Sequence, residues 1–299
     1  MKKATIIFNP VAGKGKTREL TKYLENKLLQ EFDSVEIQAT EKPRDAILFA
    51  TEACINGVHS VFALGGDGTV NEVVQGIMDA SCEKKPILGA IPGGTFNGVS
   101  RIMEFSQNPK AAINNIDFNK TEFIDIGRSN KETFNMIYSI GDVPESLHNT
   151  PVEEKSAFSV FAYAFNIARD AVKNSHYHMS INVNGENIEG DYSHVVIMLS
   201  TALSKLTLIN KGIKKNDGYL HLFILKESSL FEKIGILPDL IGGNIFENEM
   251  IKYFKTKEIL IESNEEIINT DLDGDKASPL PSKITIIPKA IEIYSLDNK

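Results

Sequence analysis

Apolar and polar residues alternate along the first third of the chain in a regular order of short strands and helices. Four short runs have the apolar or alternating pattern of strands: 5–8, 35–39, 61–64 and 87–91. Helical stretches separate them, and one carries an apolar stripe of Val70, Val73, Val74 and Ile77. Repeated β-α-β order predicts a parallel sheet with helices on both faces, which binds ligands beyond the carboxyl ends of its strands.

The pattern changes after about Asp125. Strand-like runs then follow one another, and Asn184-Gly185 between two alternating runs predicts a hairpin turn. One helix with an apolar face, Phe158 to Phe165, interrupts this region, and the chain is strand-rich again from Ile251. We therefore expect a β-rich second domain.

Composition and charge narrow the class of protein. With 299 residues and 42% hydrophobic residues, the chain can form two domains with proper cores. A net charge of -8 argues against nucleic-acid binding, which needs many Lys and Arg contacts. We expect a soluble, cytoplasmic protein, because no apolar run is long enough for a signal peptide or a spanning helix. Cys54 and Cys82 have no neighbour at metal-site or redox-motif spacing, which favours a reducing compartment.

Three glycine-rich turns each follow a predicted strand and open a helix. They are Asn9 to Lys16, Gly65 to Thr69, and Pro92 to Gly98. Glycine lets the backbone approach a ligand closely, and the free N–H groups of a helix start suit phosphate. The alternative is a tight connection without a ligand, and the first turn lacks P-loop spacing. Asp67 places a carboxylate among the second turn's glycines, where it can hold the Mg²⁺ of ATP or position the phosphates.

The second turn carries a specific resemblance. Residues 65–73, Gly-Gly-Asp-Gly-Thr-Val-Asn-Glu-Val, resemble the signature of the diacylglycerol kinase catalytic-domain family, related to sphingosine kinases and NAD kinases. Further matches stand in the family's order: Asn9-Pro10, Thr40, Asn97, Asp125 to Arg128, Asp217 to Leu220 and Asp273-Gly274. The resemblance implies an α/β plus β fold with a cleft between the domains. A Rossmann-like nucleotide-binding domain spans 1–125, joined again by 286–299, and a β-sandwich with acceptor-side residues spans 126–285.

The resemblance also implies a nucleotide site. ATP would be surrounded by Asn9, Pro10, Thr40, Gly66, Asp67, Gly68, Thr69, Val70, Asn71, Glu72 and Thr95. The glycine turns add Gly13, Lys14, Gly15, Lys16, Gly65, Gly94 and Asn97 to the predicted nucleotide-binding residues.

An acidic segment supplies the predicted catalytic base. In 271–275, Asp-Leu-Asp-Gly-Asp, three acids alternate and would share one face of an extended strand, whereas the alternative is a solvated turn. An EF-hand is rejected, because Gly274 comes too early and Ser282 replaces the closing Glu. The resemblance implies a general base at the last acid, so we expect Asp275 to act there with Asp273 beside it, although relatives carry Glu at that position.

Two more departures concern the acceptor and the metal. Gly98 stands where relatives have Asp, and Lys214 stands where an acid is expected three residues before Asp217. The resemblance implies that Asp217 binds a structural Mg²⁺, and the alternative for this residue is a plain Asp-Gly turn.

The sequence thus predicts an ATP-dependent lipid kinase that transfers the γ-phosphate to a lipid hydroxyl such as that of diacylglycerol. The alternatives are an NAD kinase and a nucleotide-binding regulator with weak or lost kinase activity. Segments 205–215 and 230–237 interleave basic and apolar residues, and we expect them to touch the inner face of the membrane reversibly. The alternative is that their apolar residues belong to the core and their lysines to a solvated rim. Such an enzyme belongs to phospholipid metabolism, and the sequence leaves a homo-oligomer open.

Overall fold

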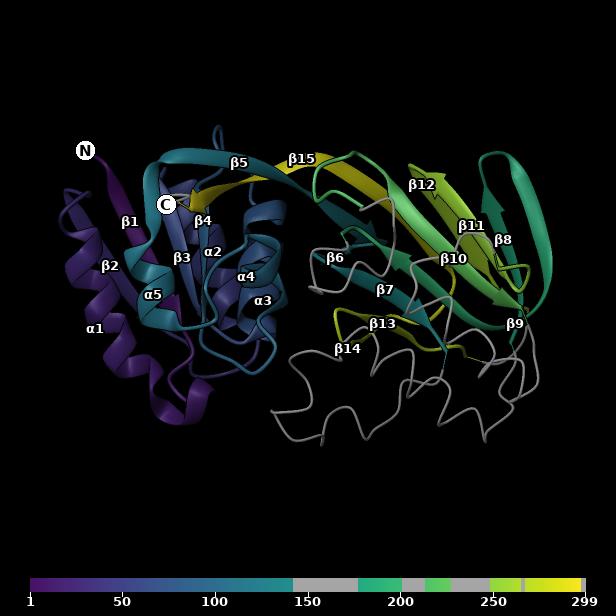
Figure 1. Ribbon diagram of the computed structural model, residues 1–299, viewed down its shortest axis with the longest axis horizontal. Helices are drawn as coiled ribbons and strands as arrows, with labels where there is room; N and C mark the ends of the chain where they lie inside the picture. The colour runs from purple at the N-terminus through teal and green to yellow at the C-terminus, as the bar shows by residue number, and fades with distance from the viewer. Residues whose placement is uncertain (142–176, 201–212, 227–247, 265–266, 297–299) are drawn as a thin grey trace. The chain divides into compact units, whose positions relative to one another are not determined.

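A computed structural model describes residues 1–141, 177–200, 213–226, 248–264 and 267–296 of the chain. The chain divides into two compact units: unit 1 is Met1–Ile124 with Lys289–Lys299, and unit 2 is Asp125–Pro288. Two long strands, β5 (Ile116–Ser129) and β15 (Ser282–Leu296), carry the chain from one unit to the other (Figure 1). The predicted helix at 158–165 lies outside the described residues, as do 205–212 and 230–237.

Unit 1 contains the parallel sheet that the sequence predicts. Its four strands are β1 (Lys3–Phe8), β2 (Ser34–Ala39), β3 (Ser60–Gly65) and β4 (Ile87–Pro92). They lie in the order β2-β1-β3-β4, and the end of β15 pairs with β4 through Ile293 and Leu88. From β1 the chain adds β2 on one side, and it then adds β3 and β4 on the opposite side of β1. The strand order therefore reverses between β1 and β3, which is a topological switch point.

Helices lie on both sides of this sheet (Figure 1). They are the 3₁₀ helix η1 (Ala12–Gly15), α1 (Thr17–Leu28), α2 (Asp45–Ile55), α3 (Asp67–Asp79), α4 (Gly98–Ile102) and α5 (Pro109–Asn114). The predicted stripe of α3 is confirmed, since Val70, Val73, Val74 and Ile77 are all buried. None of the described helices is long and apolar enough to cross a membrane.

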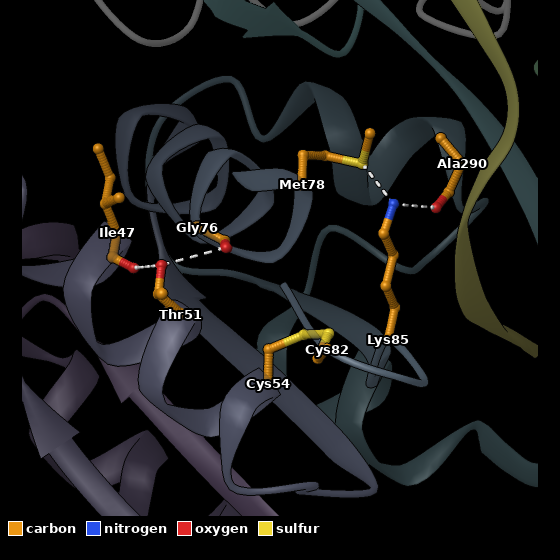
Figure 2. Close-up of a disulfide and its surroundings, with 8 residues drawn as sticks. All are labelled: Ile47, Thr51, Cys54, Gly76, Met78, Cys82, Lys85 and Ala290. Atoms are coloured by element: carbon orange, nitrogen blue, oxygen red, sulfur yellow. Dashed lines mark hydrogen bonds between the residues drawn. A yellow bond between two sulfur atoms is a disulfide. The ribbon is translucent and has the colours of Figure 1, made fainter. Parts of the chain in front are cut away.

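Helices α2 and α3 touch at a glycine. A Cβ on Gly76 of α3 would overlap the backbone oxygen of Ile47 in α2. Figure 2 shows the Thr51 hydroxyl between the two helices, 2.8 Å from the oxygen of Ile47 and 3.1 Å from that of Gly76. The absence of a side chain at Gly76 therefore sets how closely the two helices approach.

A disulfide joins the C-terminal end of α2 to the segment that follows α3. Cys54 of α2 is bonded to Cys82, which follows α3, with the two Cα atoms 5.9 Å apart (Figure 2). The two cysteines are 28 residues apart, so no short-range spacing motif in the sequence predicted their pairing. Since disulfides persist in oxidising surroundings, the cysteines no longer support the predicted reducing compartment.

Unit 2 is rich in antiparallel strands around its own core. Besides parts of β5 and β15 it contains β6 (Glu132–Phe134), β7 (Ile137–Ile140), β8 (Tyr177–Val183), β9 (Glu186–Met198), β10 (Leu220–Lys226), β11 (Ile251–Thr256), β12 (Glu258–Glu262), β13 (Thr270–Leu272) and β14 (Asp275–Ala277). Strand β9 pairs with β8 over its first half and with β7 and β10 over its second. The hairpin at Asn184-Gly185 is confirmed, with φ of 54° and 81°.

Replacing Gly76 by Ala tests the contact between α2 and α3. Ala normally stabilises a helix interior by about 0.5–1 kcal/mol relative to Gly. Here the new methyl group overlaps the Ile47 oxygen, so we expect the free energy of unfolding to fall by about 1–3 kcal/mol. Urea denaturation measures it, and an increase in that free energy would contradict the packing described.

Candidate functional site

Three glycine turns meet at one edge of the sheet in unit 1. They follow the carboxyl ends of β1, β3 and β4, which are parallel neighbours. The register pairs Phe8 with Leu64 and Gly65 with Pro92, so the three strands end at nearly the same level. This edge beside the switch point is where open α/β sheets bind ligands.

The turns contact one another through glycine backbone. The Gly93 N–H donates to the carbonyl oxygen of Gly65 at 2.8 Å. A Cβ on Gly13, whose φ is +56°, would lie 2.7 Å from the Gly93 oxygen, and one on Gly94 would overlap the Cα of Gly66. Because no side chain fits at these points, the turns present backbone groups at close range, as phosphate binding requires.

Asp67 links the second turn to the third. It is the first residue of α3, and its carboxylate accepts backbone N–H groups from Asn97 at 2.8 Å and Gly98 at 2.5 Å. Both donors belong to the start of α4, since Asn97 is its N-cap. Two donors use about half of the lone-pair sites of a carboxylate, so acceptor capacity remains for the water shell of a Mg²⁺ ion.

Burial raises the pKa of Asp67 above its ordinary value of 3.8. The backbone N–H groups of Gly98, Asn97 and Asp67 itself and the charge of Arg101 lower the pKa, but less than burial raises it. Arg101 is itself held in place, because its Nε donates to the Phe96 oxygen at 2.8 Å and its guanidinium lies 5.5 Å from the Phe96 ring centroid. The third turn therefore brings a positive charge toward a partly buried carboxylate.

The side chain of Asn97 shapes the third turn from within. Its Oδ1 accepts the Gly94 N–H at 2.8 Å, and its Nδ2 lies 3.2 Å from the Gly94 oxygen. Asn97 itself has a φ of +55°, a left-handed conformation that Asn tolerates better than most residues. Thr95, between these two residues, is exposed and remains open to a ligand.

The first turn is tied to the same edge. The Asn9 N–H donates to Leu64 at 3.1 Å, and the Asn9 oxygen accepts the Thr17 hydroxyl at 2.8 Å. Thr40 follows β2, and its N–H donates to the Phe8 oxygen at 2.9 Å. The remaining residues predicted for this turn lie in or beside η1: Pro10, Gly13, Lys14, Gly15 and Lys16.

Glu72 and Val70 have other partners than a nucleotide. The Glu72 carboxylate accepts the backbone N–H groups of Arg44 at 2.9 Å and Ala46 at 3.2 Å, and so holds the start of α2. Val70 is 3% exposed and packs in the core. The side chains of these two residues therefore pack α3 against its neighbours within unit 1, and their contact with a nucleotide stays a prediction.

The acidic segment of unit 2 is a hairpin and not one strand. Leu272 of β13 pairs with Asp275 of β14, and Asp273 and Gly274 form the turn with φ of 56° and 96°. The expectation that three acids share one strand face is wrong, because this turn reverses the chain after Leu272.

The two predicted acceptor-side acids differ in their surroundings. The Asp273 carboxylate accepts three backbone N–H groups, from Asn135 at 2.7 Å, Met136 at 2.9 Å and Ile137 at 2.8 Å. These contacts hold the start of β7, and the catalytic role predicted for Asp273 stays a prediction. Asp275 is exposed on β14, where it is open to a substrate.

Asp217 does not offer a divalent cation a set of oxygen ligands. Its Oδ2 lies 2.9 Å from Nζ of Lys255 and 3.0 Å from Nε2 of His221, and its Oδ1 accepts the Tyr219 N–H at 3.1 Å. Within the described residues, no three His, Cys, Asp or Glu side chains gather in a way that could hold a metal. The predicted structural Mg²⁺ does not fit this donor set, and the backbone has the turn of the alternative, with Gly218 at φ 77°.

Two features of the site were missed from the sequence. The backbone N–H of Gly98 serves Asp67 although the expected Asp side chain is absent, and Arg101 contributes charge. The spacing of Arg101 could have indicated its role. It lies four residues after Asn97, about one helical turn, which places it on the same side of α4 as the start of that helix.

The raised pKa of Asp67 predicts a pH dependence of stability. The folded state binds this proton more tightly than the unfolded state, so the Asp67 contribution to stability falls as pH rises from 3.8 through the raised pKa. The free energy of unfolding of wild type minus that of Asp67→Asn should therefore decrease over this range and then level off. Urea denaturation at a series of pH values measures the difference.

Asp45 provides a matched control of opposite sign. The backbone N–H groups of Glu41 and Lys42 lower its pKa below 3.8, so wild type minus Asp45→Asn should increase as pH rises toward 3.8. An increase with pH for Asp67 as well would contradict the raised pKa.

Two family models match the chain. Residues 3–129 match the diacylglycerol kinase catalytic domain, and residues 146–295 match the YegS C-terminal NAD kinase beta sandwich-like domain. The first match contains all three glycine turns, and the second contains Asp217 and the 271–275 hairpin.

Named relatives extend over nearly the whole chain. A protein of Streptococcus pneumoniae serotype 4 (strain ATCC BAA-334 / TIGR4) named "Putative lipid kinase" is 37% identical over 295 residues, covering 99% of this chain and 98% of that protein. A "Diacylglycerol kinase" of Staphylococcus aureus (strain MRSA252) is 29% identical over 295 residues, covering 98% of this chain and 92% of that protein.

Solved structures agree with the fold. "A putative diacylglycerol kinase from Bacillus anthracis str. Sterne" matches with a TM-score of 0.81 and 26% identity, covering 98% of this chain and 97% of that one. The α/β unit followed by a β-sandwich is therefore confirmed as the fold class. Together with the glycine turns, these matches show that the chain belongs to the diacylglycerol kinase catalytic-domain family and is a phosphotransferase with an alcohol acceptor.

Proposed function

We propose that this protein transfers the γ-phosphate of ATP to the hydroxyl group of a lipid, with diacylglycerol the first candidate. One observation carries the proposal: three glycine turns meet beside the switch point of the sheet, with the Asp67 carboxylate between the second and the third. The lipid acceptor is taken from the relatives named "Diacylglycerol kinase" and "Putative lipid kinase".

The donor side follows from the geometry of unit 1. Helix α3 begins at the second turn without a side chain capping its N-terminus, so its first N–H groups suit an anion. The neighbouring turns are glycine backbone, which lets phosphate oxygens approach. Mg²⁺ bound with ATP would neutralise negative charge on the phosphates, and Asp67 would orient that ion through its remaining lone pairs.

Asp275 is the proposed general base. Transfer forms a bond between the acceptor oxygen and the γ-phosphorus and breaks the bond from that phosphorus to the ADP oxygen. The hydroxyl proton passes to the Asp275 carboxylate, which is exposed, whereas Asp273 is held by three backbone groups. Asp is one methylene shorter than the Glu that the family resemblance implies at this position, and this difference affects how well the base reaches the hydroxyl.

A lipid acceptor requires contact with a membrane surface. Contact through 205–215 and 230–237 at the inner face remains our proposal, and it is local because the net charge of -8 does not attract the whole protein to anionic lipid.

Radiolabelled ATP with Mg²⁺ and a panel of acceptors tests the function. The panel contains diacylglycerol, a sphingoid base, another lipid alcohol and NAD. We expect label in a lipid, and a loss of roughly 10²-fold or more in Asp67→Ala, because the charge that orients the ion is removed. Label in NAD would replace the lipid acceptor, and saturable ATP binding without transfer would indicate a regulator.

Asp275→Asn separates the base from the nucleotide site. We expect transfer to fall by roughly 10²–10⁴-fold with ATP affinity unchanged, measured as kcat and as equilibrium binding of ATP. Glu249→Gln, another exposed acid of unit 2, is the matched control and should retain full activity. A rise in kcat for Asp275→Glu would show that the shorter base is poorly placed, whereas full activity of Asp275→Asn would remove Asp275 from the mechanism.

A further inference from the structure

The Asp217 carboxylate is the centre of a compact polar cluster in unit 2. It receives Lys255, His221 and the Tyr219 backbone N–H, all within 3.1 Å. The Asp217 side chain is only 18% exposed and that of His221 only 4%. A carboxylate buried to this degree is costly without compensation, so its partners determine whether the loop before β10 is stable.

Strand pairing brings these partners together. His221 of β10 pairs directly with Lys255 of β11, so both side chains lie on one face of the sheet beside the preceding turn. The other ring nitrogen of His221 lies 2.8 Å from the Tyr253 hydroxyl. If that hydroxyl donates to Nδ1, Nε2–H donates to Asp217, and every polar atom in the row has a partner.

The Lys255 ammonium is also held by an aromatic ring. Its Nζ lies 4.4 Å from the centroid of the Tyr219 ring, while that of Lys257 lies 5.5 Å from the same centroid. A cation over an aromatic face is attracted by the negative potential of the ring. The carboxylate and the ring therefore fix Lys255 at one point, whereas Lys257 has the ring contact without a described bond to Asp217.

The same turn is held from its other side by Asp125. The Gly218 N–H donates to Oδ2 of Asp125 at 2.6 Å, and the Asp125 N–H donates to the Lys215 oxygen at 2.8 Å. Asp125 thus binds backbone, and Asp217 binds the side chains of β10 and β11. Groups of the protein thus cross-link the turn to the sheet.

We propose that the ammonium group of Lys255 takes the place, in this chain, of the structural divalent cation that the family resemblance implies at Asp217. An ammonium at 2.9 Å from Oδ2 supplies positive charge directly beside this carboxylate. A divalent ion at about 2.1 Å from the same oxygen would lie against that charge, and Lys214 in place of an acid provides no compensating ligand. The β-sandwich therefore folds without Mg²⁺, and the enzyme needs this ion only with its nucleotide.

Thermal unfolding of the nucleotide-free full chain tests this replacement. The midpoint Tm is measured by circular dichroism after dialysis against EDTA, with and without added millimolar Mg²⁺. We expect the wild-type Tm to be the same in both conditions. Lys255→Met, which keeps most of the aliphatic chain and removes the charge, should lower Tm by roughly 2–6 °C, because Asp217 is left without its cation.

Lys257→Met is the matched control, since it removes a neighbouring ammonium over the same ring, and its Tm should stay near that of wild type. Partial recovery of the Lys255→Met Tm by Mg²⁺, absent in Lys257→Met, would show the ion entering the vacated place. A loss confined to Lys255→Met without recovery also supports the ammonium as the structural cation.

A wild-type Tm that falls in EDTA and returns with Mg²⁺ overturns the proposal, and so does an equal loss of Tm in the two variants. If Lys255→Met does not fold, the wild-type comparison and Lys255→Arg, which keeps the charge and should keep the Tm independent of Mg²⁺, decide the question. All readouts are stabilities, so the result is independent of the lipid kinase assay.

Discussion

The carboxylate of Asp67 holds together the starts of two helices in unit 1. It belongs to the first turn of α3 and accepts the backbone N–H groups that open α4, so a partly buried negative charge fixes the second glycine turn against the third. Burial makes this charge costly, and the N–H donors and Arg101 offset the cost in part. The second turn is thus held against the third by the Asp67 carboxylate and by the backbone bond from Gly93 to Gly65, because the glycines of these turns have no side chains of their own.

The sequence was sufficient for the parts of the fold that depend on local patterns. Apolar periodicity predicted the strands and α3, and Asn184-Gly185 predicted its hairpin, since each is determined by neighbours in sequence. Contacts across the chain were not accessible in this way. The bond from Asp67 to Gly98 joins residues 31 positions apart, and neither residue type specifies its partner. Cys54 and Cys82 are the two cysteines of the chain, but nothing in their local sequence shows that residues 28 positions apart lie close enough to bond.

The acidic residues of unit 2 show why residue type alone misassigns roles. Asp273, Asp125 and Asp217 are all engaged by hydrogen-bond donors of the protein, and these contacts maintain turns and strand ends. Only the surroundings distinguish them from Asp275, which is exposed. A carboxylate that receives several donors is already solvated by the protein, whereas one that faces water can exchange a proton with a ligand.

The packing of glycine against glycine between turns has an evolutionary consequence. Gly94 and Gly66 share one small space, since a Cβ on Gly94 would overlap the Cα of Gly66. A larger residue at either position would push the two turns apart. Once the turns are apart, the other position no longer needs to be glycine. Effects of substitutions at such a pair are not additive. The three turns are therefore constrained to change together, as one backbone surface rather than as three separate motifs.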